Sequence, residues 1–155
     1  MAYRIEGLER APFEPLFALS DAALAAKSAR RVVADRKPGF PCRISLRDAE
    51  IGERLILVNH VSQEAATPYR ASHAIYVREQ AVEPALFVDR LPAVLEGRPL
   101  SLRGFDSDGM LRGALLAMPG EADAKIRELL GRPEIETIHA HNAAHGCFAA
   151  KIERS

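Results

Sequence analysis

The sequence lacks an excess of charge of either sign. Its 155 residues include 21 Lys and Arg against 21 Asp and Glu, so the formal net charge at pH 7 is zero. Nucleic-acid binders need clustered Lys and Arg to neutralise phosphates. The best basic cluster, at 30–37, is interrupted by Asp35, and such mixed charge is typical of a solvated face. We therefore expect no nucleic-acid partner.

Long apolar runs are also missing. No stretch approaches the roughly 18 to 20 consecutive apolar residues that cross a bilayer, and residues 1–10 lack the basic-then-apolar pattern of a secretory signal. We expect no membrane partner and a cytoplasmic location. With only two cysteines, Cys42 and Cys147, the sequence argues against a disulfide framework and indicates free thiols.

What is present suffices for one domain over residues 1–155. A chain of this length buries about 68 to 70% of its unfolded surface, and 48% of its residues are hydrophobic. No internal repeat or long linker divides it. A core can therefore form without disulfide bonds or metal.

The apolar pattern predicts an α+β fold. Turn residues at 106–109 indicate a hairpin, Ser20 and Asp21 offer N-cap oxygens to a helix at 22–28, and a second helix is predicted at 121–130. Strand-like segments lie at 3–8, 30–35, 53–60, 72–78, 99–105, 110–118, 134–141 and 147–154. Residues 81–99 are expected to form a connection with a helical turn at 93–96. We expect a mainly antiparallel, curved sheet of about seven strands, with two or more short helices packed on it.

The segment 138–148 concentrates groups that can carry chemistry. It holds three of the five histidines, one of the two cysteines and an asparagine. On a strand, His139 and His141 project from one face about 6.5 to 7 Å apart, so both imidazoles can reach one ion. A zinc site would need further ligands from Cys147, His145 or Cys42. The spacing typical of dedicated metal sites is absent, so metal is an alternative and not the favoured interpretation.

The strand register decides whether Cys147 joins the two histidines. If Asn142 lies opposite Cys147, the thiol lies on the face opposite His139 and His141. If His141 lies opposite Cys147, the thiol shares their face, and a β-bulge can change either arrangement. The sequence leaves both registers open.

A thiol or an arginine can also carry function. Cys42 or Cys147 can act as a nucleophile if a neighbouring imidazole such as His141 activates it, although a structural role is favoured because no protease or redox signature surrounds either cysteine. Arg70 can clamp an anion, with a hydroxyl from Ser72 beside it. The alternative for Arg70 is a surface ion pair.

Several motifs together resemble a known family. They are Gly39-Phe40-Pro41-Cys42-Arg43, Pro68-Tyr69-Arg70-Ala71-Ser72, Leu100-Ser101-Leu102-Arg103, Asp108-Gly109-Met110, His139-Ala140-His141-Asn142-Ala143 and Gly146-Cys147-Phe148. They are similar to the small bacterial family of uncharacterised proteins known as domain of unknown function 1203, and the resemblance runs from Tyr3 to Arg154. It implies no activity, substrate or cofactor.

The leading functional hypothesis is one pocket that binds a small polar or anionic molecule. Its expected lining comprises Cys42, Arg70, Ser72, His139, His141 and Asn142. The second hypothesis is a hydrolase- or transferase-type enzyme in which a cysteine or a metal-bound water attacks the substrate, with Cys42, His141 and Cys147 as catalytic candidates and His139, His141 and Cys147 as metal candidates. The third is a structural or protein-interaction domain.

Overall fold

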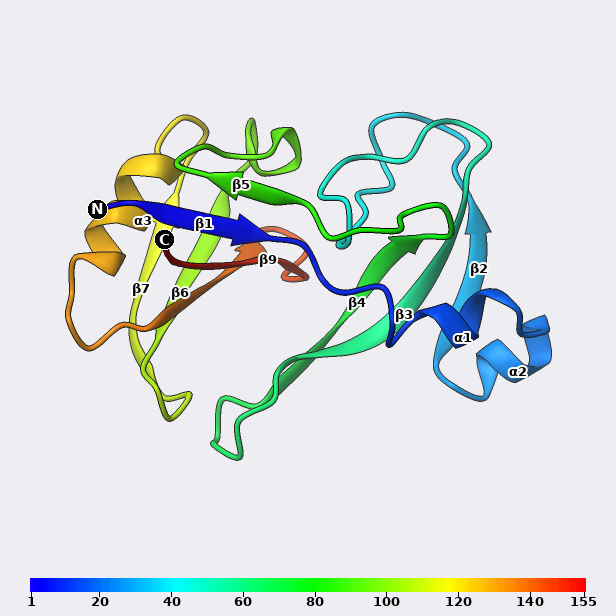
Figure 1. The fold of residues 1–155 in the computed structure, drawn as a ribbon, viewed down its shortest axis with the longest axis horizontal. Helices are drawn as coiled ribbons and strands as arrows, with labels where there is room; N and C mark the ends of the chain where they lie inside the picture. The colour runs from blue at the N-terminus through cyan, green and yellow to red at the C-terminus, as the bar shows by residue number, and fades with distance from the viewer.

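The computed structural model describes residues 1–155 and contains two antiparallel sheets that lie side by side (Figure 1). The elements in chain order are β1 (Tyr3–Glu6), α1 (Glu14–Phe17), α2 (Asp21–Ala25), β2 (Ala29–Val33), β3 (Arg54–Gln63), β4 (Ala71–Arg78), β5 (Leu86–Val88), the 3-10 turn η1 (Ala93–Leu95), β6 (Leu100–Phe105), β7 (Leu111–Ala117), α3 (Ala122–Leu130), β8 (Thr137–Asn142) and β9 (Phe148–Arg154). None of the helices combines the length and apolar character that a membrane-spanning helix requires.

The larger sheet has six strands in the order β5-β1-β9-β8-β6-β7. Helix α3 packs against β6, β7 and β8, because Ile126, Leu129 and Leu130 recur at helical spacing and are fully buried. Together with residues such as Ile138 and Ile152, they form a core cluster of 18 buried residues. The two chain termini meet beside this sheet, where the Ser155 amide donates to the Ala2 carbonyl (Figure 1).

The smaller sheet has three strands in the order β2-β3-β4 and is accompanied by α1 and α2. Ser20 caps α2, since its side chain accepts from the Ala23 amide. Leu24 of this helix joins a second core cluster of 12 buried residues, with Ile56, Ile75 and others from the sheet. Burial of one helix face and one sheet face stabilises this half of the molecule.

Three contacts join the two halves of the molecule and position the site. Phe148 at the start of β9 belongs to the core cluster of the smaller sheet, and the Leu8 amide, just after β1, donates to the Arg43 carbonyl. At the hairpin tips, Thr67 Oγ1 donates to the Gly109 carbonyl at 3.1 Å. The space between the sheets is therefore bounded by strands of both.

The predicted α+β class, with mainly antiparallel strands and short helices, is confirmed. The strands number nine and are divided between two sheets, a division that depends on long-range pairing. The connection expected at 81–99 contains the helical turn η1, and it also contains β5, which pairs with β1 at the sheet edge. Strand β5 has only the three apolar residues Leu86–Val88, which is too short for an alternating pattern to mark it in the sequence.

Candidate functional site

A cavity of about 480 Å³ lies between the two sheets. Its walls come from the loop between β2 and β3, from β3 and β4, from the turn before β6, and from the connection between β8 and β9. Its polar side chains include Arg36, Arg43, Arg98, Asn142, His145 and Cys147. Asp48 is the one carboxylate in the lining, and its Oδ1 accepts from the Gly39 amide at 3.2 Å. Positive side chains therefore dominate the cavity.

Arg43 is buried at the wall of this cavity, with 3% of its surface exposed. Its Nε donates to the Phe148 carbonyl at 2.8 Å, and its Nη2 contacts Cys147 Sγ at 3.7 Å. The Arg43 amide donates to the Tyr76 carbonyl, which fixes this loop to β4. Burial lowers the pKa of Arg43, and Cys147 counteracts that effect.

No carboxylate compensates the charge of Arg43, because none of the ion pairs in the structure includes it. A second lining arginine, Arg98, also takes part in no ion pair. Arg36 differs, since its Nη1 binds Asp35 Oδ1 at 3.1 Å near the surface. A buried charge without a counter-charge is costly, so the arrangement is suited to an incoming anion.

Cys147 reaches the cavity because of the register of the last hairpin. The Asn142 amide donates to the Cys147 carbonyl, and His141 lies opposite Phe148, with a bulge between Ala140 and His141. Of the two registers left open by the sequence, the structure has Asn142 opposite Cys147. The thiol therefore lies on the face of β8 opposite His139 and His141.

The sulfur of Cys147 accepts from two side chains. Asn142 Nδ2 lies 3.1 Å from Sγ, and Arg43 Nη2 lies 3.7 Å from it. Asn142 is only 8% exposed, and its Oδ1 is buried without a hydrogen-bond partner. The cavity wall thus presents a sulfur between two donors, while the unpaired Oδ1 of Asn142 is itself enclosed by protein atoms.

His139 and His141 face a separate and smaller cavity of about 160 Å³, which Arg103 also lines. Their rings pack around Phe148 at centroid distances of 5.5 and 5.8 Å, and His73 lies 4.7 Å from His141. His141 Nδ1 donates to the Gly146 carbonyl at 2.9 Å, whereas His139 Nδ1 has no partner.

The pKa values of both histidines are strongly lowered. Burial, followed by the positive charges of Lys151 and Arg103, lowers the pKa of His139 to about 4. Burial also lowers the pKa of His141 to about 4; the hydrogen bond to Gly146 acts in the opposite direction, and Arg103 acts with burial. At neutral pH, both imidazoles are therefore uncharged inside the interface between the sheets.

The proposed metal ligands are not brought together. Cys147 lies across β8 from His139 and His141, and no group of three or more His, Cys, Asp or Glu side chains is placed to hold a metal ion. His145, the third histidine of the segment, is exposed at the rim of the larger cavity. The structure thus gives no support to a zinc site built from His139, His141 and Cys147.

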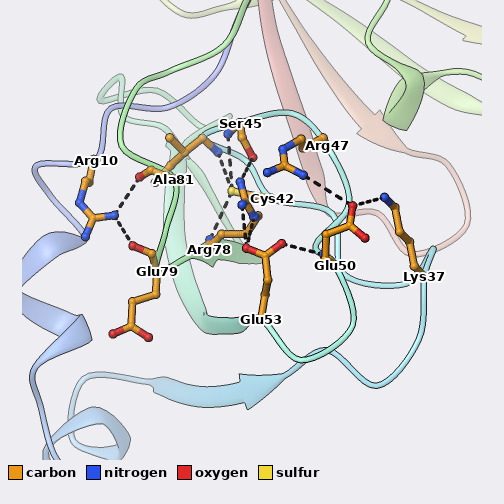
Figure 2. Close-up of polar contacts among 11 residues, drawn as sticks. Arg10, Lys37, Cys42, Ser45, Arg47, Glu50, Glu53, Arg78, Glu79 and Ala81 are labelled. Atoms are coloured by element: carbon orange, nitrogen blue, oxygen red, sulfur yellow. Dashed lines mark hydrogen bonds and ion pairs between the residues drawn. The ribbon is translucent and has the colours of Figure 1, made fainter.

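Cys42 lies inside the loop between β2 and β3 and is fully buried. Its Sγ accepts from the backbone amides of Ile44, Ser45 and Arg78 at 3.3 to 3.5 Å (Figure 2). Arg78 in turn binds Glu53 through Nε and Nη2 at 3.0 and 2.7 Å, in an ion pair that is almost wholly buried. Cys42 therefore organises the loop and lies outside the lining of the larger cavity.

Arg70 and Ser72 line neither cavity. Arg70 is exposed in the tip of the β3–β4 hairpin, and its Nη1 donates to the Glu64 carbonyl. Ser72 is exposed on β4 opposite Val61. Arg70 thus braces its own hairpin by a backbone contact instead of binding a surface acid.

Of the residues proposed from the sequence, Asn142 and Cys147 line the larger cavity, while His139 and His141 line the smaller one. Sequence reasoning missed Arg43 and Arg98. One feature of the sequence could have identified Arg43, because this residue ends the motif Gly39-Phe40-Pro41-Cys42-Arg43. No motif includes Arg98.

Comparison with known proteins supports the resemblance seen in the motifs. No curated protein and no solved structure matches the chain. A family model described as protein of unknown function (DUF1203) matches residues 39–154, a range that includes Arg43, Arg98, Asn142 and Cys147. Most of the cavity lining therefore falls within the region that defines the family, and the chain belongs to the DUF1203 family.

Proposed function

We propose that this protein binds a small anionic molecule, carrying a carboxylate or a phosphate, in the cavity between its two sheets. The observation that carries the proposal is Arg43, a buried guanidinium at the cavity wall with no carboxylate partner. Protein interiors normally compensate such a charge. A bound anion would supply the compensation here.

The cavity has the dimensions and chemistry for such a ligand. Its volume of about 480 Å³ falls in the usual range of roughly 300 to 1,000 Å³ for small-molecule sites. Arg98 provides a second guanidinium without a carboxylate partner, and guanidinium groups bind carboxylates and phosphates through paired hydrogen bonds. Apolar side chains such as Leu57 and Ile75 line the same space, so the ligand has room for a short apolar part.

The test measures binding by calorimetry and thermal shift with probes of matched size and opposite charge. Succinate and inorganic phosphate are the anionic probes, and 1,4-diaminobutane is the cationic control. We expect the anions alone to bind. Arg98→Ala should weaken their binding by about 10- to 150-fold, because a hydrogen bond to a charged group contributes roughly 1.5 to 3 kcal/mol.

Arg90→Ala is the matched control variant. Arg90 stacks on Phe87 at 4.6 Å, forms no ion pair and does not line the cavity, so its replacement should leave anion binding unchanged. The proposal fails if neither anion binds, if the diamine binds equally well, or if the two arginine variants behave alike.

A further inference from the structure

We infer that Cys147 is a reactive thiol that forms mixed disulfides with anionic low-molecular-weight disulfides entering the cavity, an inference that rests on the proposed anion binding. Of the two free cysteines, Cys147 is partly exposed at the cavity wall, whereas Cys42 is fully buried. One thiol is therefore within reach of a ligand. The ligand's acidic group would bind Arg98 while its sulfur approaches Cys147.

The contacts of Cys147 place two hydrogen-bond donors beside its sulfur. Arg43 Nη2 and Asn142 Nδ2 both donate toward Sγ, and neither nitrogen can accept a hydrogen bond from the thiol. The thiolate is the nucleophilic form of cysteine, and a neighbouring guanidinium stabilises it. Because Arg43 is also held by the Phe148 carbonyl, the donor is in place before any ligand binds.

Asn142 provides a second and independent indication of a ligand. It is buried to more than nine tenths, lines the cavity, and leaves Oδ1 without a partner while its Nδ2 is engaged by the sulfur. An unpaired buried acceptor costs roughly 1 to 3 kcal/mol. Because Oδ1 itself has almost no accessible surface, a ligand N–H or O–H group would reach it once the Asn142 side chain turns toward the cavity.

No histidine forms a hydrogen bond with Sγ, although His145 lines the same cavity at its exposed rim, and this favours one type of reaction. Acyl transfer by cysteine needs an acid or base to handle poor leaving groups, and this is the usual task of a neighbouring histidine; here the groups in contact with Sγ are Arg43 and Asn142. Disulfide exchange needs no such group, because the leaving thiolate is stable by itself.

The step is a simple substitution at sulfur. Cys147 loses its proton to water, and its Sγ attacks one sulfur of the disulfide. The disulfide S–S bond breaks as the new S–S bond forms, and the other half leaves as a thiolate that water protonates. Cys147 is oxidised to the mixed disulfide and the released half is reduced. Since Cys42 is buried among three backbone amides, no second thiol is available to displace the adduct.

The experiment compares three disulfides that differ in charge: 3,3′-dithiodipropionate (anionic), 2-hydroxyethyl disulfide (neutral) and cystamine (cationic). Intact mass spectrometry follows the full-length protein at pH 7.5 and low salt, and peptide mapping locates the adduct. Each rate is divided by the rate of the same disulfide with 2-mercaptoethanol, which removes intrinsic differences in reactivity.

We expect one adduct, on Cys147, and a normalised rate at least about tenfold higher for the anionic than for the cationic disulfide, since charged clefts raise association rates by 10 to 1,000-fold. Arg98→Ala and 0.5 M NaCl should each reduce this preference to about threefold or less, whereas Arg90→Ala should preserve it. Cys147→Ser should form no adduct.

An adduct on Cys42, no adduct at all, or equal normalised rates for the three disulfides would overturn the inference. Succinate binding to Cys147→Ser separates the two proposals, because this variant cannot react. Retained binding without a charge preference in the wild-type reaction means that the inference alone fails. If neither Cys147→Ser nor the wild-type protein binds succinate, both the proposed function and this inference fail.

Discussion

Acidification should destabilise the fold through His139, and replacing this residue with Phe should remove that effect. The folded-state pKa of His139 is about 4, below its ordinary value of about 6.5. Between these two values, the unfolded chain binds more protons than the folded one. Stability therefore decreases as the pH falls from 6.5 toward 4.

The size of the effect follows from the two pKa values. Between pH 7.5 and pH 5.0, a single group with a pKa of about 6.5 unfolded and about 4 folded loses about 2 kcal/mol of stability. His141 has the same folded value and should contribute a similar loss. His60 and His73 add to it in the same direction, because burial lowers the pKa of each.

His139→Phe keeps an aromatic ring at this position and removes the titratable imidazole. The imidazole lies between Phe105 and Phe148, at centroid distances of 4.9 and 5.5 Å, and its Nδ1 makes no hydrogen bond. A phenyl ring therefore loses no polar contact of Nδ1, although its larger size can cost about 1 kcal/mol at every pH. The readout is consequently the difference in stability between the two pH values.

Urea unfolding at pH 7.5 and pH 5.0 measures this difference. The free energy of unfolding of His139→Phe should decrease by about 2 kcal/mol less than that of the wild-type protein. His145→Gln, at an exposed position in the same segment, is the matched control and should retain the wild-type decrease. An identical pH dependence for His139→Phe and wild type would refute the reasoning.

Further predictions concern contacts within the two halves of the molecule. Glu53→Gln leaves the Arg78 guanidinium buried without its counter-charge, so the free energy of unfolding should fall by about 3 to 5 kcal/mol in thermal unfolding. The control Glu50→Gln removes an exposed ion pair with Lys37 and should cost about 1 kcal/mol or less. Similar losses in the two variants would contradict this prediction. Burial raises the pKa of Glu53, but the hydrogen bonds from Arg78 and the Glu50 amide, together with the charges of Arg78 and Arg47, hold the pKa below its usual value. The contribution of Glu53 should therefore be present above pH 4.5 and disappear as the pH falls through the folded value. Gly7→Ala places a Cβ 1.9 Å from the Ile44 carbonyl oxygen, so it should destabilise the fold by more than about 4 kcal/mol. If the urea midpoint of this variant equals that of the wild-type protein, the backbone moves to accommodate the methyl group and the prediction is wrong.

Most strands and the helices α2 and α3 could be predicted because their signals are local. Ile126, Leu129 and Leu130 recur at helical spacing, and the turn at 106–109 joins β6 to β7, as expected. The division into two sheets could not be predicted, since it depends on β1 pairing with β9 across almost the whole chain. No local pattern specifies a contact of that separation.

The site was harder to predict for the same reason. The motif around Cys42 drew attention to the cysteine, yet its sulfur points into the loop and accepts backbone amides. The next residue, Arg43, extends to Phe148 and Cys147, more than 100 positions further along the chain. A motif locates a segment, but the packing around it determines which of its side chains faces the cavity.

Strand β8 shows how the pleat of one strand divides a cluster that looks like a single site in the sequence. His139 and His141 project to one face, where they are buried and uncharged around Phe148 at neutral pH and help to join the two sheets. Asn142 projects to the other face, and the hairpin register brings Cys147 beside it at the cavity. Because alternate residues of a strand point in opposite directions, loss of the histidines should affect stability, whereas loss of Asn142 or Cys147 should affect chemistry in the cavity. Variants of the histidines therefore test the contact between the sheets, whereas variants of Asn142 and Cys147 test the proposed binding site. All four residues belong to one six-residue strand and the turn that follows it.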